Sequence, residues 1–307
     1  MGAASLSACG CGYRPEPDYV MHKDGPQPHG KAREDYAVSG SGGTNASYAE
    51  NYFKRDEAEI ASLPKKNHQT YEVRTFKSGA TYKGQWLNGK RHGRGIHRWK
   101  DGASYEGEWK NNMAEGLGRF KHAEGDEYLG EWKHNAAQGR GVYRHRDGTV
   151  YEGHFSNDLQ DGYGKENWSD NSSFSGQFSN GQKNGHGVYR WPDGSKYHGQ
   201  WVCNQINGCG TYVGTDGREY RGQWLASTMS GCGRYSWQDG RTYEGQYVKD
   251  QKEGFGIYTW ADGRRYEGFW LGSVHHGHGR LCDQDGHSKA AKWNHGKRIE
   301  WLDSREG

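Results

Sequence analysis

The sequence predicts an all-β fold, an elongated and twisted single-layer antiparallel β-meander of stacked hairpins, preceded by a largely disordered N-terminal region. The first observation is a 23-residue period that runs without insertion from Tyr82. The second is that hydrophobic residues make up only 31% of the chain, so a thick aliphatic core is not expected. The third is that aromatic residues nevertheless reach 14%, unlike in disordered chains, and are accompanied by 50 glycines.

Nine aromatic residues open the repeats, and we count repeat positions from them. They are Tyr82, Tyr105, Tyr128, Tyr151, Phe174, Tyr197, Tyr220, Tyr243 and Tyr266. Glycine stands at positions 3, 12 and 14 of all nine repeats, and at position 21 of eight, with Asn171 as the exception. All eleven tryptophans between residues 82 and 288 fall at position 5 or 18. Such regularity indicates one structural unit that stacks on its own copies.

Each repeat contains two short alternating runs, such as residues 174–178 and 185–191, and each run ends in a turn of the Asn-Gly or Asp-Gly type. This pattern is typical of a β-hairpin. Alternation places positions 1, 3 and 5 on one face, together with positions 12, 14, 16 and 18 of the return strand. Each ring can then lie over a glycine of a neighbouring strand, while mostly charged and polar residues occupy the other face.

The aromatic face is expected to stay partly open, because little sequence remains to cover it with a second layer. Tyr and Trp are enriched at binding hot spots. We therefore expect this face to bind a partner helix or extended peptide, or a second copy of the chain. The residues expected to contact the partner are Tyr105, Trp109, Tyr128, Trp132, Tyr143, Tyr151, Trp168, Tyr189, Trp191, Tyr197, Trp201, Tyr212, Tyr220, Trp224, Tyr235 and Trp237.

The repeat resembles the MORN repeat (membrane occupation and recognition nexus), through motifs such as Tyr105-Glu-Gly-Glu-Trp-Lys-Asn111 and Tyr189-Arg-Trp-Pro-Asp-Gly194. The resemblance covers residues 82–288 in register. Residues 71–81 look like a half-repeat cap and residues 289–302 like a C-terminal cap, so we expect one repeat domain over 70–307.

The resemblance implies a β-sheet scaffold that often dimerises and belongs to cytoskeletal, axonemal or membrane-contact assemblies, and it implies phosphoinositide binding. The pair Lys90-Arg91 matches the basic turn of the family motif and is the candidate contact for a lipid headgroup. Later copies carry pairs such as Met113-Ala114 and Leu159-Gln160 at the same place. A row of turn cations is therefore largely missing, and solvated loop charges are the alternative interpretation.

Residues 1–69 do not repeat and are expected to be mostly disordered, with one short helix at about residues 48–63 that Pro64 ends. Tyr52, Phe53, Ile60 and Leu63 give this helix a weak apolar side. Two interpretations remain open, a transient helix and a segment that docks on the aromatic face.

The first residues contain a candidate lipidation site. Gly2 follows Met1, and Cys9 and Cys11 lie nearby, as in chains that carry a myristoyl and a palmitoyl group. Leu6 stands where the myristoylation motif has Ser or Thr. The alternative is an ordinary flexible start of the chain.

The remaining features argue against catalysis and metal binding. A net charge of +3 does not indicate nucleic acid, and the sequence has neither a long apolar run nor a secretory signal. The His275-His276-Gly-His278 stretch lacks further ligands at metal-site spacing, and acids at position 20, such as Asp101, are typical of turns. Six scattered cysteines fit a reducing, intracellular setting. We expect no cofactor and no enzymatic activity.

Taken together, these features predict a non-enzymatic scaffold that binds protein partners through its aromatic face. It would be cytoplasmic, on the cytoplasmic side of a membrane through N-terminal acylation, or associated with the cytoskeleton or a cilium. The alternatives are a structural component of a cytoskeletal or axonemal (radial-spoke-like) assembly, and a phosphoinositide-binding membrane-contact protein.

Overall fold

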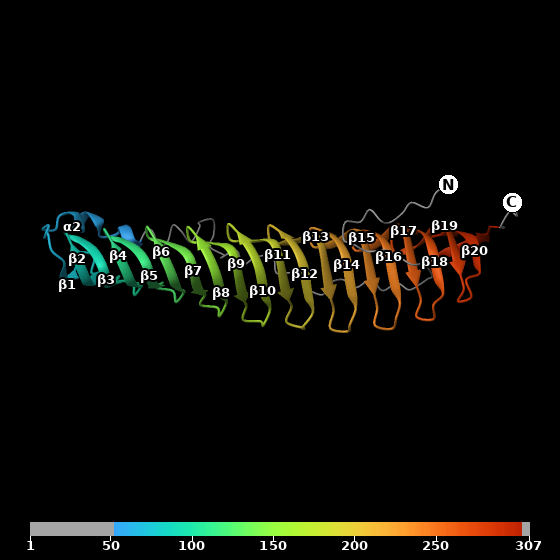
Figure 1. Cartoon of the computed structure of the whole chain (residues 1–307), viewed down its shortest axis with the longest axis horizontal. Helices are drawn as coiled ribbons and strands as arrows, with labels where there is room; N and C mark the ends of the chain where they lie inside the picture. The colour runs from blue at the N-terminus through green and yellow to red at the C-terminus, as the bar shows by residue number, and fades with distance from the viewer. Residues whose placement is uncertain (1–51, 303–307) are drawn as a thin grey trace. The chain divides into compact units, whose positions relative to one another are not determined.

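The computed structural model describes residues 52–302, and this part of the chain is almost entirely β-structure (Figure 1). Apart from helical residues 52–54 and the short helix α2 (Glu57–Ala61), the chain forms one antiparallel sheet of 21 strands. The strands are β1 Thr70–Thr75, β2 Thr81–Leu87, β3 Lys90–Arg98, β4 Ser104–Lys110, β5 Met113–Lys121, β6 Glu127–Lys133, β7 Ala136–Arg144, β8 Val150–Ser156, β9 Leu159–Asn167, β10 Ser173–Ser179, β11 Gln182–Arg190, β12 Lys196–Val202, β13 Gln205–Val213, β14 Glu219–Leu225, β15 Thr228–Ser236, β16 Thr242–Val248, β17 Gln251–Thr259, β18 Arg265–Leu271, β19 Val274–Cys282, β20 Ser288–Asn294 and β21 Lys297–Trp301. The predicted meander of hairpins is confirmed.

The described chain divides into two compact units, which we treat separately. The first unit comprises the described residues up to Gly185 and contains the helical residues and β1 to β10. The second unit begins at His186 and contains β12 to β21. We call them the first and second units below.

The hairpin β2–β3 shows how one repeat folds. Its turn consists of Asn88 and Gly89, both with positive φ (52° and 71°), which is the type I′ geometry that matches the twist of paired strands. The register shifts by two residues between Gly84 and Trp86, because two steps along β2 are matched by four steps along β3 in a bulge of the return strand. The return strand begins directly after the two-residue turn, at Lys90, and Arg91 at position 10 pairs with Trp86.

The tyrosine that opens each repeat explains the invariant glycines. The ring of Tyr82 lies over Gly95, where a Cβ atom would overlap it. Its hydroxyl donates a hydrogen bond to the carbonyl oxygen of Gln85 at 3.0 Å, and eight of the repeats make this bond. Trp86 and Trp109 contact the same ring edge-to-face, with centroid distances of 5.0 and 5.5 Å. The prediction that rings lie over glycines is confirmed.

Side chains in the turns also join one repeat to the next. The backbone N–H of Arg91 donates to Oδ1 of Asn112, in the turn of the following repeat, at 2.7 Å, and the N–H of Asn112 donates back to the carbonyl of Arg91 at 3.0 Å. At the other end of the hairpin, Asp101 Oδ1 accepts the N–H of Ala103 at 3.2 Å, as expected for turn chemistry.

Candidate protein-binding site

The aromatic face is more closed than we expected. Of the sixteen side chains predicted to contact a partner, fourteen are buried, and only Tyr143 and Trp237 are half-buried. Part of the reason is that the rings pack against one another. Tyr105, for example, lies edge-to-face between Trp109 and Trp132, at centroid distances of 4.9 and 5.2 Å. The position-1 and position-5 rings therefore belong to the folding core of each repeat.

Position 10 also contributes to this face, which the sequence analysis missed. Alternation along a return strand that begins at position 9 would have found it, because position 10 then lies on the same side as positions 12, 14 and 16. Arg91 is 0% exposed, and its guanidinium carbon lies 4.3 Å from the centroid of the Trp109 ring. Arg91 is thus a buried strand residue and not an exposed turn cation facing a lipid headgroup, whereas its neighbour Lys90 is exposed.

In the first unit, residues 52–64, which we call the docked segment, lie on the aromatic face. Phe53 is 1% exposed and sits among five rings. Their centroids lie 5.3 to 6.1 Å from that of Phe53, and they belong to Trp99, Tyr105, Trp109, Phe120 and Trp132. Tyr52 packs edge-to-face on Trp99 at 5.0 Å, and Ile60 is buried. Of the two interpretations left open by the sequence, the structure shows the segment docked on the aromatic face.

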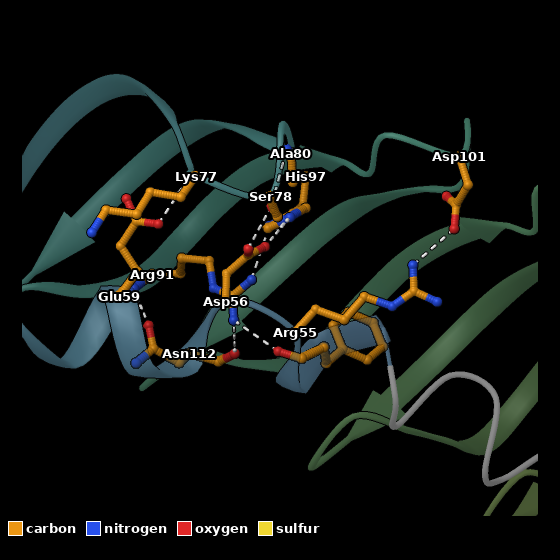
Figure 2. A network of polar contacts seen from close by, with 11 residues as sticks. Arg55, Asp56, Glu59, Lys77, Ser78, Ala80, Arg91, His97, Asp101 and Asn112 are labelled. Carbon is orange, nitrogen blue, oxygen red and sulfur yellow. Dashed lines mark hydrogen bonds and ion pairs between the residues drawn. The ribbon is translucent and has the colours of Figure 1, made fainter.

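A buried polar network joins the docked segment to the sheet (Figure 2). Asp56 accepts a hydrogen bond from the Ser78 hydroxyl at 2.7 Å, and its other carboxylate oxygen lies 3.3 Å from Nε2 of His97. Nδ1 of His97 lies 2.9 Å from Nη1 of Arg91, and Nη2 of Arg91 donates to the carbonyl oxygen of Phe53 at 3.3 Å. Asp56, His97 and Arg91 therefore form a continuous chain across the interface.

The direction of the proton donors follows from the chemistry of Arg91. A guanidinium can only donate, so Nδ1 of His97 accepts and the imidazole carries its proton on Nε2, facing Asp56. Burial, together with the positive charge of Arg91, lowers the pKa of His97 to about 3, which keeps the ring neutral. Burial also lowers the pKa of Arg91 to about 10, partly countered by Tyr82 and Asp56. The network thus separates a buried cation from a buried anion by one neutral imidazole.

Two contacts at the rim complete the docking. Arg55 forms an ion pair with Asp101 at 2.8 Å, and the backbone N–H of Lys77 donates to Glu59 at 2.8 Å (Figure 2). Both contacts are exposed, so each adds little to the docking free energy. The docked segment is held mainly by Phe53 and by the buried network.

In the second unit, position 10 carries the apolar Ile206 and Met229 in two repeats and the polar Lys252 and His275 in the next two. The Lys252 ammonium lies 4.9 to 5.3 Å from the centroids of four rings, an arrangement that favours a cation. His275 is 0% exposed and stacks on Tyr266 at 3.9 Å. Burial, with a smaller effect of Lys252, lowers its pKa to about 3.

Several other predicted features can be placed. Gly2, Cys9 and Cys11 lie outside the described residues. His275 is part of the aromatic face, whereas His276 contacts the ring of His295 at 4.9 Å.

Asp283, Asp285 and His287 form the single His/Cys/Asp/Glu group within ligand distance in residues 52–302, and all three are exposed. Oδ1 of Asp283 accepts the N–H groups of Asp285 and His287, which is turn geometry. Over the same residues, no helix has the length and apolarity needed to span a bilayer.

Comparison with known proteins identifies the repeat. The model of the MORN repeat matches nine consecutive segments, which are residues 82–104, 105–127, 128–150, 151–173, 174–196, 197–217, 220–240, 243–264 and 266–288. No curated protein sequence matches the chain.

Solved structures with some similarity include two domains from animals. The TCP10 domain of CPAP from Danio rerio shares 11% sequence identity, with 76% of this chain and 100% of that domain covered and a TM-score of 0.37. The TCP domain of SAS-4 from Drosophila melanogaster, solved with a proline-rich motif of Ana2, shares 10% identity, with 58% and 90% covered and a TM-score of 0.34. TM-scores at this level do not establish a shared fold.

Proposed function

Because this chain belongs to the MORN repeat family, we propose that it is a non-enzymatic repeat scaffold that binds a helical or extended protein segment on its aromatic face. The observation that carries the proposal is the packing of Phe53 among five rings of the first unit. The face accommodates a short helical segment there and supplies both apolar contacts and hydrogen-bonding groups to it.

The buried state of the position-1 and position-5 rings changes which side chains a partner would touch. Their flat faces are used within the sheet, so a partner contacts ring edges and the less buried positions, such as Tyr143 and Trp237. Aromatic rings remain good anchors in this geometry, because edge-to-face pairs contribute beyond the area that they bury.

A photocrosslinking experiment tests this proposal. We would replace Tyr143 and Trp237 of the aromatic face, one at a time, with a benzophenone amino acid in the native cell. The matched controls are Tyr163 and Phe255, which are exposed on the opposite face. Defined protein adducts are expected from the aromatic-face positions and not from the controls. Equal adducts from both faces, or none from either, would contradict the proposed role of the aromatic face.

Acylation of Gly2, Cys9 and Cys11 remains a separate proposal, and it would place the scaffold at a membrane surface. Gly2→Ala beside the wild type, followed by cell fractionation, tests it. Equal partitioning of the two proteins into the membrane fraction would rule out an N-terminal myristoyl anchor.

A further inference from the structure

We infer that residues 52–64 are an intramolecular ligand of the aromatic face, and that a partner segment with the same chemistry displaces them. This chemistry is an aromatic pair followed, three residues after its second ring, by a carboxylate, as in Tyr52, Phe53 and Asp56. The inference rests on the proposed function and names the class of segment that the first unit recognises.

The Asp56 side chain binds to the sheet and does not cap its own helix. Asp56 is the N-cap residue of α2, where an aspartate normally accepts an N–H group of the first helical turn. Its side chain makes no such bond here. Instead its oxygens face Ser78 and His97, which belong to the repeat domain. The Asp56 carboxylate therefore contributes to docking on the sheet and not to capping of α2.

On the sheet side, the docked segment meets a buried cation that suits a carboxylate. Arg91 is fully buried, and its carbonyl contacts, the main-chain oxygens of Phe53 and Asn112, carry no full charge. A buried guanidinium that lacks an anion is costly. His97 extends this site toward Asp56: its Nδ1 accepts from Arg91, and its Nε2 lies 3.3 Å from the Asp56 carboxylate. The site therefore selects an acidic residue at this place in a bound segment.

The docked segment is short enough to dissociate from the sheet. Helix α2 has only five residues, so it is not stable in isolation. Residues 64–69 that connect it to β1 form no helix or strand. Docking and helix formation are consequently coupled, and the net docking free energy is the small difference between burial of Phe53 and the ordering of the segment. A competing segment that brings the same anchors can exchange with it.

The experiment uses the full chain and a fluorescent synthetic peptide with the sequence of residues 48–64. The chain is opened by Phe53→Ala with Asp56→Asn, which removes the two anchors and leaves the repeats intact. The wild type and Glu57→Gln are the controls, since Glu57 is an exposed carboxylate in the same helix. Fluorescence anisotropy measures binding, and circular dichroism confirms that all three proteins are folded.

The peptide should bind the opened chain at least about tenfold more tightly than either control, because a tethered segment competes at an effective concentration near the millimolar range. A peptide in which the residue equivalent to Asp56 is Asn should bind the opened chain at least about tenfold more weakly. Failure of the peptide to bind the opened chain, or equal binding to all three proteins, would overturn the inference. If the double variant does not fold, Asp56→Asn alone replaces it with the same criteria.

This assay is independent of any native partner. Peptide binding without face-specific crosslinks in the cell would reject the proposed function and keep the intramolecular ligand. Face-specific crosslinks without peptide binding would support the proposed function and reject the intramolecular ligand.

Discussion

His97 in the first unit and His275 in the second are both fully buried, yet they play different roles in their surroundings. His97 lies between Arg91 and Asp56 and connects the docked segment to the sheet. His275 is enclosed by rings, and neither of its nitrogens has a hydrogen-bond partner among the described residues. Burial lowers the pKa of both to about 3. A depressed pKa therefore reports burial, and the partners decide whether the imidazole stabilises the fold.

The largest expected effect comes from removing the cation beside His97. Arg91→Met leaves Asp56 buried without a counter-charge, which costs roughly 3–5 kcal/mol unless the segment undocks and exposes Asp56 to water. We expect undocking, so the amides of Ile60, Ser62 and Leu63, which are hydrogen-bonded in the docked segment, should lose protection in hydrogen exchange. Lys90→Met, at the exposed neighbouring position, is the control. Equal protection in the two variants would show that the network does not hold the segment.

The next effect depends on pH and isolates His275. Its folded-state pKa of about 3 lies below the ordinary value of 6.5, so between these values the unfolded chain binds the proton and the folded chain does not. Its contribution to stability is therefore complete above about pH 6.5 and is lost as the pH falls toward 3. His275→Met should gain about 2 kcal/mol over the wild type between pH 7 and pH 5 in urea unfolding of the second unit.

The comparison with a variant is needed because buried carboxyl groups have the opposite sign. Burial raises the pKa of Glu166 and of Glu244 to about 7. Each of these groups stabilises the fold at low pH and loses that contribution as the pH rises toward 7. The pH profile of the wild-type free energy of unfolding combines the effects of the histidine and of the carboxyl groups. The difference in this free energy between His275→Met and the wild type reports the histidine alone. A difference that does not change with pH would contradict the depressed pKa.

A smaller effect distinguishes the two histidines at pH 7. His275→Met removes a buried polar group that lacks a partner, so it should raise the free energy of unfolding by about 1 kcal/mol. His97→Met removes the buried hydrogen bond to Arg91 and the 3.3 Å contact with Asp56, and it should lower the free energy of unfolding by about 2 kcal/mol. Thermal unfolding of the two variants measures the signs. Changes of the same sign would show that polar contacts do not explain a difference in stability between His97 and His275.

The smallest effect concerns the face opposite the aromatic face, where Leu225 of the second unit and Lys110 of the first unit both stand at position 6. Leu225 of the second unit is 61% exposed, and Lys110 of the first unit is also exposed. Leu225→Lys and Lys110→Leu should each change the free energy of unfolding by less than about 0.5 kcal/mol, because neither side chain is packed. A larger change in either variant would indicate that this face is covered in the folded protein.

Much of the fold could be predicted because its signals are local and repeated. The turn at Asn88 and Gly89 follows from residue type, and the need for Gly95 follows from the ring of Tyr82 on the adjacent strand of the same repeat. The burial of Arg91 could have been predicted in the same way. It was missed because a basic pair after a turn looks like a turn, while the β-bulge and the early start of β3 place Arg91 inside the sheet.

The docked segment could be predicted only in part. Four apolar residues indicated a weak helix, and the stop at Pro64 indicated where it ends. Nothing periodic connects Asp56 to His97, because one lies outside the repeats and the other stands at a position that is aromatic in many copies. The contact between Asp56 and His97 depends on how a non-repeating segment packs on the repeats in three dimensions. The residue pattern of a single sequence does not reveal such packing.

The hydrogen bonds between successive turns determine which deletions or insertions the fold can accept. Arg91 donates to Asn112, and Ala114 donates in the same way to Asn135, each at 2.7 Å. Deleting residues 105–127 would bring Asn135 to the place of Asn112 and restore every partner. Deleting one residue fewer would turn each later side chain to the wrong face. The chain can therefore gain or lose only whole repeats, which accounts for nine repeats in succession without an inserted residue.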